Sequence, residues 1–471
     1  MLAMRGVSLV ERPENAGTLA QVEEGIETLT MTNGLIPENH PMKAGCLNGL
    51  GYFLRRFQRL DSIADVDEAI TTQRQAIHLT PDGHPEKPDR LINLGNSLQS
   101  RFERLGDVAD LEETFTVRKQ AVRLTSDDQA SKPAYLHNLG VSYHQWFERL
   151  GDIADLNEAI TVQQRALKLT PDGHPYKPRF LNGLGTSFHS RFERLGGVAD
   201  LRQTIAMKQQ AVSLTSDGHP DKSMYLDSLG NAFQSQFGRL GDVAALHEAI
   251  TMMRQVVCLT PDGHRHKPVC LNNLGFSLFH RFGRLGNMDD IDEAITVTQH
   301  AIRLTPDGHP QKPRYINNLG NSLLRRFGHP GCIADVDEAI TANQYAIRLT
   351  PDGHLHKPAR LDNIGCAFLI RFGRLGGIAD LNEAIAAHQK AVRLTPDDHP
   401  HKPMCLDNLG YSLLCRFEHL GGIADLHEMM TMKQQAVSLI SDGHSDEHRY
   451  LNNLGVAFRS QFKHLGDIQS R

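Results

Sequence analysis

Apolar side chains recur along the chain in two alternating patterns, each with the spacing of a helix. The first pattern is clear at Leu181, Leu184, Phe188, Phe192 and Leu195. Spacings of three and four residues place these side chains on one face of a helix, which we call helix A. The second pattern, helix B, spans residues 152–169 and places Leu156, Ile160, Gln163 and Leu167 on one line. The sequence therefore predicts an all-α protein built from pairs of helices.

Residues with known preferences for helix ends mark the limits of each helix. Gly196 follows the last apolar residue of helix A, where we expect a left-handed C-terminal cap. Asp152 and Asp155 suit the N-terminus of helix B, which favours negative charge. Pro171 ends helix B because proline cannot continue a helix.

The helix pair repeats with a constant period of 45 residues. The glycine of a Leu-Gly or Ile-Gly pair in helix A stands at 95, 140, 185, 230, 275, 320, 365, 410 and 455. Repeats of this kind stack on their neighbours and form an α-solenoid. We expect the solenoid to occupy residues 18–467, with an irregular segment at 1–17 and a short tail at 468–471. Residues 20–43 match a degenerate helix B and joint, so we expect an array open at both ends.

The segment LTPDGHP, found at 79–85, 169–175 and 304–310, joins helix B to the next helix A. Its histidine recurs at His84, His174, His219, His264, His309, His354, His399 and His444, while Gln129 replaces it in one copy. Equivalent residues of stacked helices lie about 10 Å apart, whereas zinc holds nitrogen ligands at about 2.1 Å. We therefore expect structural histidines and no metal site, although HxH pairs occur at 264/266, 354/356 and 399/401.

Two further recurring residues predict close packing. A glycine inside helix A costs about 1 kcal/mol relative to alanine, so we expect each one to permit a close helix contact. The small residues Ala159, Ala166, Ala384 and Ala391 of helix B are the expected partners. We also expect a core phenylalanine in each unit, at Phe57, Phe102, Phe147, Phe192, Phe237, Phe282, Phe327, Phe372, Phe417 and Phe462.

Composition narrows the range of partners. The chain of 471 residues has a formal net charge of -5 and no basic stripe, so we expect no nucleic-acid partner. Its seven cysteines show no CxxC spacing, which favours reduced thiols and a cytoplasmic location. The sequence has neither a signal peptide nor an apolar run of 18 residues, so we expect no membrane partner. The oligomeric state is not predicted.

The repeat resembles the tetratricopeptide repeat (TPR). Leu184, Gly185 and Phe188 are similar to the family's helix A motif, and Ala159, Ala166 and Pro171 have the spacing of its helix B motif. HKPVCLNNLG at 266–275 is similar to kinesin light-chain repeats, and the 45-residue unit to fungal TPR arrays, some of which precede a CHAT peptidase domain. The resemblance implies a right-handed superhelix. We expect no CHAT domain within residues 1–471, so its catalytic residues are not carried over to any position here.

The sequence contains no motif that indicates catalysis. A Walker loop, a GxSxG elbow and an HExxH helix are all missing, so we expect neither catalytic nor cofactor-binding residues. Acidic pairs such as Asp65 and Glu68 are interpreted as solvated surface or as partners for a set of recurring arginines. This set comprises Arg101, Arg191, Arg281, Arg326, Arg371 and Arg416.

The concave face of the solenoid is the predicted binding surface. In the tetratricopeptide-repeat family, which this chain resembles, helix A lines the concave face. A helical wheel places Asn273, Phe276 and His280 opposite the apolar line of helix A. The asparagine recurs at Asn93, Asn138, Asn318, Asn363, Asn408 and Asn453. Asparagine both donates and accepts hydrogen bonds, which suits a peptide backbone. The asparagine could equally be a solvent-exposed residue that keeps this helix face hydrated, or it could bond to the neighbouring repeat.

Apolar residues gather on this face towards the C-terminus. Three residues after each asparagine the early units have Asn96, Val141, Thr186 and Asn231, whereas later units have Phe276, Cys366 and Tyr411, with Asn321 as an exception. Ile370 and Cys415 add to the apolar character. Exposed aromatic residues favour a partner at this surface. The predicted peptide-binding residues are Asn273, Phe276, Asn318, Asn363, Ile370, Asn408 and Tyr411.

The sequence therefore predicts a non-catalytic scaffold that binds protein or peptide segments in its concave groove. One alternative is a regulatory or sensor array whose CHAT-like effector domain is absent from this chain. A second alternative is an enzyme of unrecognised type, which a cluster of strongly perturbed titratable groups in one pocket would support.

Overall fold

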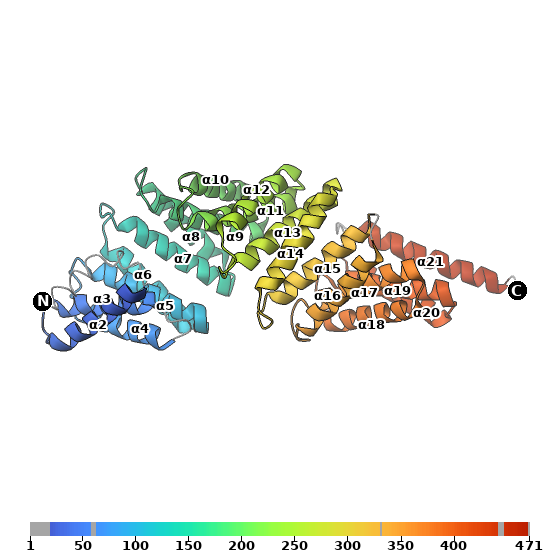
Figure 1. The fold of residues 1–471 in the computed structure, drawn as a ribbon, viewed down its shortest axis with the longest axis horizontal. Coiled ribbons are helices and arrows are strands. Elements are labelled where there is room, and N and C mark those ends of the chain that lie inside the picture. Colours follow the sequence, from blue (N-terminus) through green and yellow to red (C-terminus); the bar gives the residue numbers. More distant parts are fainter. Residues whose placement is uncertain (1–18, 58–62, 330–331, 441–446, 470–471) are drawn as a thin grey trace. The chain divides into compact units, whose positions relative to one another are not determined.

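The computed structural model describes residues 19–57, 63–329, 332–440 and 447–469. Within these ranges the regular structure consists of helices α2–α21, and no strand occurs (Figure 1). The predicted all-α class is confirmed. The segment expected at 1–17 lies outside the described residues.

The chain divides into two compact units, which the constant period did not predict. Unit 1 is Met1–Ser235 and unit 2 is Gln236–Arg471, so the boundary falls inside α11 (Lys222–Leu240). We describe the two units separately.

Unit 1 alternates A and B helices from its first described helix. Its B helices are α2 (Leu19–Leu35), α4 (Ile63–His78), α6 (Val108–Leu124), α8 (Ile153–Lys168) and α10 (Val198–Ser213). Its A helices, besides the first part of α11, are α3 (Lys43–Phe57), α5 (Lys87–Leu105), α7 (Lys132–Leu150) and α9 (Lys177–Leu195). Each of these four A helices packs between the B helix before it and the B helix after it.

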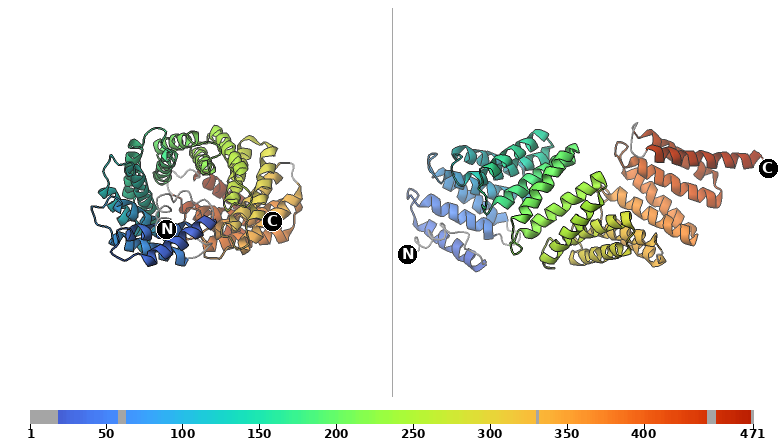
Figure 2. Two further views of the ribbon diagram at one scale, coloured as in Figure 1. Left: turned by 60° about the vertical axis from the view of Figure 1, so that its left-hand side comes forward. Right: turned by 90° about the horizontal axis from the view of Figure 1, so that it is seen from above.

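Unit 2 continues the same alternation. Its A helices, besides the end of α11, are α13 (Lys267–Leu285), α15 (Lys312–Phe327), α17 (Lys357–Leu375), α19 (Lys402–Leu420) and α21 (Glu447–Gln469). Its B helices are α12 (Val243–Leu259), α14 (Met288–Leu304), α16 (Ile333–Arg348), α18 (Ile378–Leu394) and α20 (Ile423–Ser438). Figure 2 shows the stacked helix pairs of both units from two further directions. In each unit consecutive A helices also touch, as α7 touches α9 and α17 touches α19.

The helix ends follow the sequence signals. Gly196 caps α9 in the left-handed conformation, with φ of 72°, as predicted. The Asp152 side chain caps α8 by accepting a hydrogen bond from the backbone N–H of Ala154 at 2.9 Å. No helix among the described residues combines the length and apolar character that crossing a bilayer requires.

The core phenylalanines are buried to different degrees. Phe192, Phe282 and Phe417 are at most 9% exposed, which confirms the prediction for them. The prediction is wrong for Phe462, which is 79% exposed on α21 because no described helix packs over that part of the helix. Phe102, Phe147, Phe237, Phe327 and Phe372 are partly buried, and the side chain of Phe57 lies outside the described residues.

Recurring arginines tie helix A to helix B in both units. Arg101 donates two hydrogen bonds to the carboxylate of Asp110 and a third to Asp67 of the preceding repeat. Asp110 lies 45 residues after Asp65 and is its equivalent in the next repeat. Arg191, Arg281, Arg326, Arg371 and Arg416 make the same paired contact with Asp200, Asp290, Asp335, Asp380 and Asp425. The interpretation of the acidic residues as arginine partners is confirmed for these pairs.

Candidate functional site

The joint between helix B and helix A is held by its own hydrogen bonds. The ring Nδ1 of His174 accepts a hydrogen bond from the backbone N–H of Tyr176 at 3.2 Å. The same bond forms at His40, His84, His219, His264, His309, His354 and His399, with lengths of 3.1 to 3.2 Å. These histidines have the structural role predicted for them, and His444 lies outside the described residues.

A buried lysine completes the joint, and the sequence reasoning missed it. Lys87 stands at the start of α5 and is 7% exposed. Its Nζ donates to the carbonyl oxygens of Ile77 and Thr80, at 3.0 and 2.5 Å, where α4 ends. The Ile77 carbonyl also accepts a hydrogen bond from the backbone N–H of Thr80 at 3.1 Å. The lysine adds a charged donor to these carbonyls and complements the negative end of the helix dipole. The lysine that recurs at the start of helix A, in most copies followed by proline, was the available signal.

In most repeats the glycine of the Leu-Gly or Ile-Gly pair lies against a side chain of the following B helix, whereas a Cβ atom added at Gly455 would meet no atom within 4 Å. A Cβ atom added at Gly140 would lie 2.5 Å from Cγ of Gln163, so the predicted close contact is confirmed there. The expected partners Ala159 and Ala166 are fully buried, but Gln163 between them makes the contact. We call the residues in this position the glycine-facing side chains. They are Gln73, Arg118, Gln163, Lys208, Thr298, Asn343, His388 and Lys433.

The glycine-facing side chains are buried and chemically diverse. None is more than 4% exposed, and they include amides, cations, a hydroxyl and an imidazole. Burying a polar group costs free energy unless it is hydrogen-bonded. Gln163, for example, accepts a hydrogen bond from Ser187 Oγ at 2.8 Å. These side chains differ from repeat to repeat at a position where the packing is otherwise the same. They are therefore candidates for residues that determine which ligand each repeat binds.

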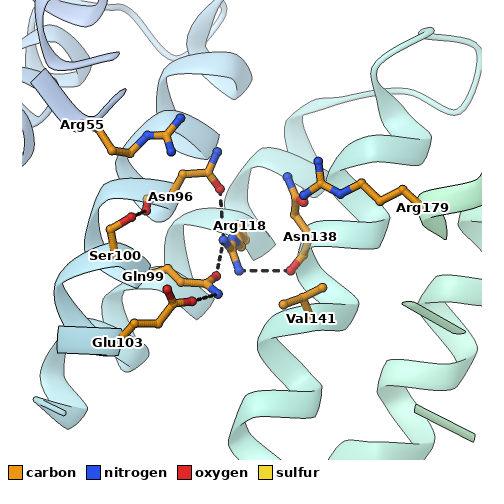
Figure 3. Close-up of a pocket in the computed structure, with 9 residues that line it drawn as sticks. All are labelled: Arg55, Asn96, Gln99, Ser100, Glu103, Arg118, Asn138, Val141 and Arg179. Carbon is orange, nitrogen blue, oxygen red and sulfur yellow. Dashed lines mark hydrogen bonds between the residues drawn. The ribbon is translucent and has the colours of Figure 1, made fainter. Parts of the chain in front are cut away.

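In unit 1 one of these side chains forms the floor of a cavity of about 330 Å³. Figure 3 shows Arg118, from α6, between the A helices α5 and α7. The cavity is lined by Arg55, Asn96, Gln99, Ser100, Glu103, Arg118, Asn138, Val141 and Arg179. Asn96, Asn138 and Val141 occupy the positions that the helical wheel assigned to the binding face. Arg118 was not predicted.

Arg118 is held by uncharged oxygen atoms. Its NH1 donates to the backbone carbonyl of Asn138 at 3.2 Å and to Ser142 Oγ at 2.8 Å. Its NH2 donates to the side-chain oxygens of Asn96 and Gln99, at 3.1 and 2.6 Å. Burial, and then the positive charge of Arg179, lowers the pKa of Arg118 to about 9. The cation is thus buried without a hydrogen bond to a carboxylate.

In unit 2 the predicted asparagines bond to the preceding repeat. The Nδ2 of Asn318 donates to Asn272 Oδ1 at 2.9 Å, and that of Asn363 donates to Asn317 Oδ1 at 3.0 Å. Asn408 donates to both carboxylate oxygens of Asp362, at 2.9 and 2.8 Å. The asparagine row therefore links consecutive A helices, as the structural alternative proposed. Contact of these residues, and of the half-buried Asn273, with a ligand stays a prediction.

Of the predicted apolar anchors, two are exposed and one is not. Phe276 on α13 is 45% exposed and Tyr411 on α19 is 53% exposed. The Phe276 ring packs edge-on against His280, one turn later, with ring centroids 4.3 Å apart. Ile370 is only partly exposed, because it packs against the core cluster that contains Val336 and Phe368. The structure thus exposes the two predicted aromatic anchors, Phe276 and Tyr411.

A Ser-His-Asp arrangement occurs in the core of unit 2. His388 Nδ1 lies 2.8 Å from Ser412 Oγ, and His388 Nε2 lies 3.7 Å from Asp362 Oδ1. Burial lowers the pKa of His388 to about 4 and raises that of Asp362 to about 6. Ser412 and His388 are both 0% exposed, so a substrate cannot reach the hydroxyl. The arrangement is a buried hydrogen-bond network without the access that nucleophilic catalysis requires.

The largest cavity described in unit 2 lies at two joints, away from the predicted anchors. Its volume is about 700 Å³, and its walls come from residues 352–359 and 393–405. His354, His356, His399 and His401 line it beside apolar residues such as Leu355 and Met404. Within the described ranges no three His, Cys, Asp or Glu side chains are placed to hold a metal ion.

Comparisons with known proteins find similar solved structures. No protein-family model and no curated protein matches the chain. YrrB, a TPR protein with an unusual peptide-binding site, is 17% identical with a TM-score of 0.32, and the match covers 49% of this chain and 96% of that one. The Podospora anserina putative kinesin light chain with nearly identical TPR-like repeats is 16% identical with a TM-score of 0.35, over 47% and 96% of the two chains.

A third match spans almost the whole chain. The human IFIT1 dimer with m7Gppp-AAAA is 11% identical with a TM-score of 0.46, over 98% of this chain and 94% of that one. YrrB and the kinesin light-chain-like protein are described as TPR and TPR-like proteins. The alternating, stacked helix pairs of the structure confirm the resemblance to tetratricopeptide repeats at the level of fold. At these identities the likeness shows the fold alone and identifies no ligand.

Proposed function

We propose that the array is a non-catalytic scaffold that binds protein or peptide segments along the surface of its A helices. The observation that carries this proposal is the exposure of Phe276 and Tyr411, at 45% and 53%, on A helices. Large aromatic side chains in water favour a partner that covers them. If the chain is part of a longer protein with an effector domain, the same surface would serve as its sensor.

The role of each residue in binding follows from its contacts. Phe276 and Tyr411 supply apolar area, which is the main source of affinity at binding hot spots. Asn318, Asn363 and Asn408 stand on the A helices between or beside them and fix the spacing of those helices through their inter-repeat bonds. Their half-buried amides would contact the backbone of an extended segment. Ile370 contributes less than the two aromatic residues because it is already packed.

The proposal also accounts for the perturbed titratable groups without catalysis. Burial is the largest cause of the pKa shifts of Asp362, His388 and Cys366. Asp362 and His388 belong to the packed interior of unit 2, and Cys366 is half-buried beside them. A catalytic cluster would combine such shifts with a cleft that a substrate can enter. The exposed aromatic residues instead point to binding.

Peptides selected from a random library on the full chain would test the proposal. Tyr411→Ala should weaken their binding by about 1–3 kcal/mol, as loss of an aromatic hot spot does, without lowering the melting temperature. The triple variant Phe276→Ser, Ile370→Ser, Tyr411→Ser should abolish binding measured by fluorescence anisotropy.

A matched control carries serine at Leu285, Leu375 and Leu420, which are 54 to 62% exposed at the ends of A helices. This control should bind like the native chain. If the control lost binding equally, or if the triple variant retained it, the A-helix surface of unit 2 would not be the binding site.

A further inference from the structure

The cavity of about 700 Å³ at the two joints of unit 2, which we call the joint cavity, has no role in the proposed function. One of its walls is the joint that precedes α17, and the other is the end of α18 with the joint that precedes α19. A cavity of this size can cover most of the surface of a small molecule. The side chains of the two walls indicate which kind of molecule would fit.

Apolar side chains form much of the joint cavity. Leu355 replaces the last proline of the LTPDGHP joints, and its side chain is 70% exposed. Met404 lines the other wall, and Ala359 is its equivalent in the repeat before. At the same position other repeats have a charged residue, as at Asp89 and Arg179. Exposed apolar side chains gathered in a cavity favour a ligand that covers them.

The histidines of the two joints add hydrogen-bond donors to the lining. The ring Nδ1 of His354 accepts a hydrogen bond from the backbone N–H of His356 at 3.1 Å. The ring Nδ1 of His399 accepts one from the backbone N–H of His401 at 3.2 Å. A neutral imidazole whose Nδ1 accepts a hydrogen bond carries its proton on Nε2, so Nε2 is a donor in both rings. The ligand should therefore bring acceptors.

The charged groups of the lining favour a negatively charged acceptor. Arg393 lies in the last turn of α18, and its exposed guanidinium forms no hydrogen bond or ion pair with a described residue. Asp352 is the only carboxylate in the lining, and it lies 3.3 Å from Lys357 Nζ and 3.2 Å from Lys390 Nζ. The carboxylate is thus already paired, whereas the guanidinium is available to a ligand.

We propose that the joint cavity binds a small apolar molecule that carries a carboxylate group. Arg393 would hold the carboxylate through two parallel charge-assisted hydrogen bonds, and its single charge matches that of one carboxylate. The Nε2–H groups of His354 and His399 are the further donors of the lining. Leu355 and Met404 would cover the apolar body. The inference does not rest on the proposed function, which places its ligand on the A helices.

Three compounds titrated into the full chain provide the test: naphthylacetate, the neutral naphthylacetamide, and acetate, which lacks the apolar body. By isothermal titration calorimetry naphthylacetate should bind with a Kd of about 1 mM or tighter, the modest affinity expected of a molecule of this size. The amide should bind at least about tenfold more weakly because it lacks the charge-assisted bonds. Acetate should not bind at the same concentrations. Naphthylacetate should also slow hydrogen exchange at residues 352–359 and 393–405.

Variants with matched controls test the two parts of the site separately. Arg393→Gln should remove the preference for the acid over the amide without changing the melting temperature, because Arg393 is exposed. Arg303→Gln changes the equivalent exposed arginine two repeats earlier, in the last turn of α14 and outside the cavity, and should leave the preference intact. Leu355→Ser should weaken the acid and the amide alike, by up to about tenfold, because both lose apolar contact.

The proposal would be overturned if naphthylacetate did not bind, if the acid and the amide bound equally, or if both arginine variants had the same effect. Loss of naphthylacetate binding in the triple serine variant at Phe276, Ile370 and Tyr411 would place the acid on the A-helix surface, and it would overturn the proposal too. Failure of the proposed function is seen separately, because that function is measured by peptide binding and does not depend on Arg393 or Leu355.

Discussion

Unit 1 and unit 2 share the same helix pair but present different chemistry on their A helices. Three residues after the recurring asparagine of helix A, unit 1 has the polar or small residues Asn96, Val141 and Thr186. Asn96 and Val141 line a cavity together with Arg118. At the same positions unit 2 has Phe276 and Tyr411, with Asn321 and Cys366 between them. Unit 2 exposes aromatic rings, whereas unit 1 has a cationic cavity.

This difference shows which positions the fold constrains. Core positions keep residues of similar volume in both units, as at Leu184, Leu274 and Ile364, because a change in volume there costs stability. The glycine-facing position is equally buried, yet it changes from Arg118 to His388 because each side chain finds its own hydrogen-bond partners. The repeats can therefore differ in recognition without a change of backbone.

The largest effect is expected from the core of unit 2. Phe282 is 2% exposed and packs with Ile291, Ile295 and Leu319. Phe282→Ala should cost about 3–5 kcal/mol, as other buried phenylalanines do. Because repeats contact only their neighbours, hydrogen exchange should rise in α13–α15 and stay unchanged in α3–α9. Uniform loss of protection in both units would show that they unfold as one body.

Phe462 offers a matched control at the same position of the repeat. It is 79% exposed, so Phe462→Ala should change the free energy of unfolding by less than about 0.5 kcal/mol, as exposed substitutions do. A large cost would mean that this side chain is covered in solution.

Acidification should destabilise unit 1 around α7–α9 more than unit 2 around α17–α19. Burial, followed by the charges of Arg179 and Arg118, lowers the pKa of His137 to about 3, and burial lowers that of His189 to about 4. The unfolded chain binds protons at these histidines below pH 6.5, whereas the folded chain does not. Stability is therefore lost as the pH falls from 6.5 towards 4, by about 2 kcal/mol at pH 5 for His137 alone.

In unit 2 two opposite shifts offset each other. The low pKa of His388, about 4, destabilises the fold as the pH falls, but the high pKa of Asp362, about 6, stabilises it over the same interval. Hydrogen exchange at pH 5 and pH 7 should therefore change less in α17–α19 than in α7–α9. Asp362→Asn should remove the offset and make α17–α19 acid-sensitive. If this variant showed no greater sensitivity, the two groups would not be coupled in this way.

The sequence predicted the fold well because a 45-residue period repeats every packing signal many times. Gly196, Asp152 and Phe282 each take the place that local rules assign. The helical wheel that selected Phe276 also assigned Asn96 and Val141 to the binding face, and in the structure both line the cavity of unit 1. Arg118 was missed because it belongs to helix B, at the position that Gln163 occupies on the apolar line of the next helix B. The hydrophobic pattern does not show which buried polar residue on that line reaches a cavity.

The division into two units and the partners of the asparagines also could not be predicted. The spacing of the glycines is the same on both sides of α11, so the sequence carries no mark at Ser235. Asn318 bonds to Asn272, which lies 46 residues earlier. This offset exceeds the period by one residue, and it depends on how consecutive A helices are packed. Repeat patterns describe one unit at a time and contain no information on that packing.

The smallest effect is expected at the joints, where the two units should behave alike. His174 in unit 1 and His309 in unit 2 each accept one backbone hydrogen bond at 3.2 Å through Nδ1. A glutamine side chain also carries an acceptor, and Gln129 already occupies this position in one joint. His174→Gln and His309→Gln, alone or together, should change the free energy of unfolding by less than about 0.5 kcal/mol and leave metal content unchanged. Thermal melting and metal analysis of the purified chain would check this, and stoichiometric zinc that disappears with the histidines would show that the joints bind metal after all.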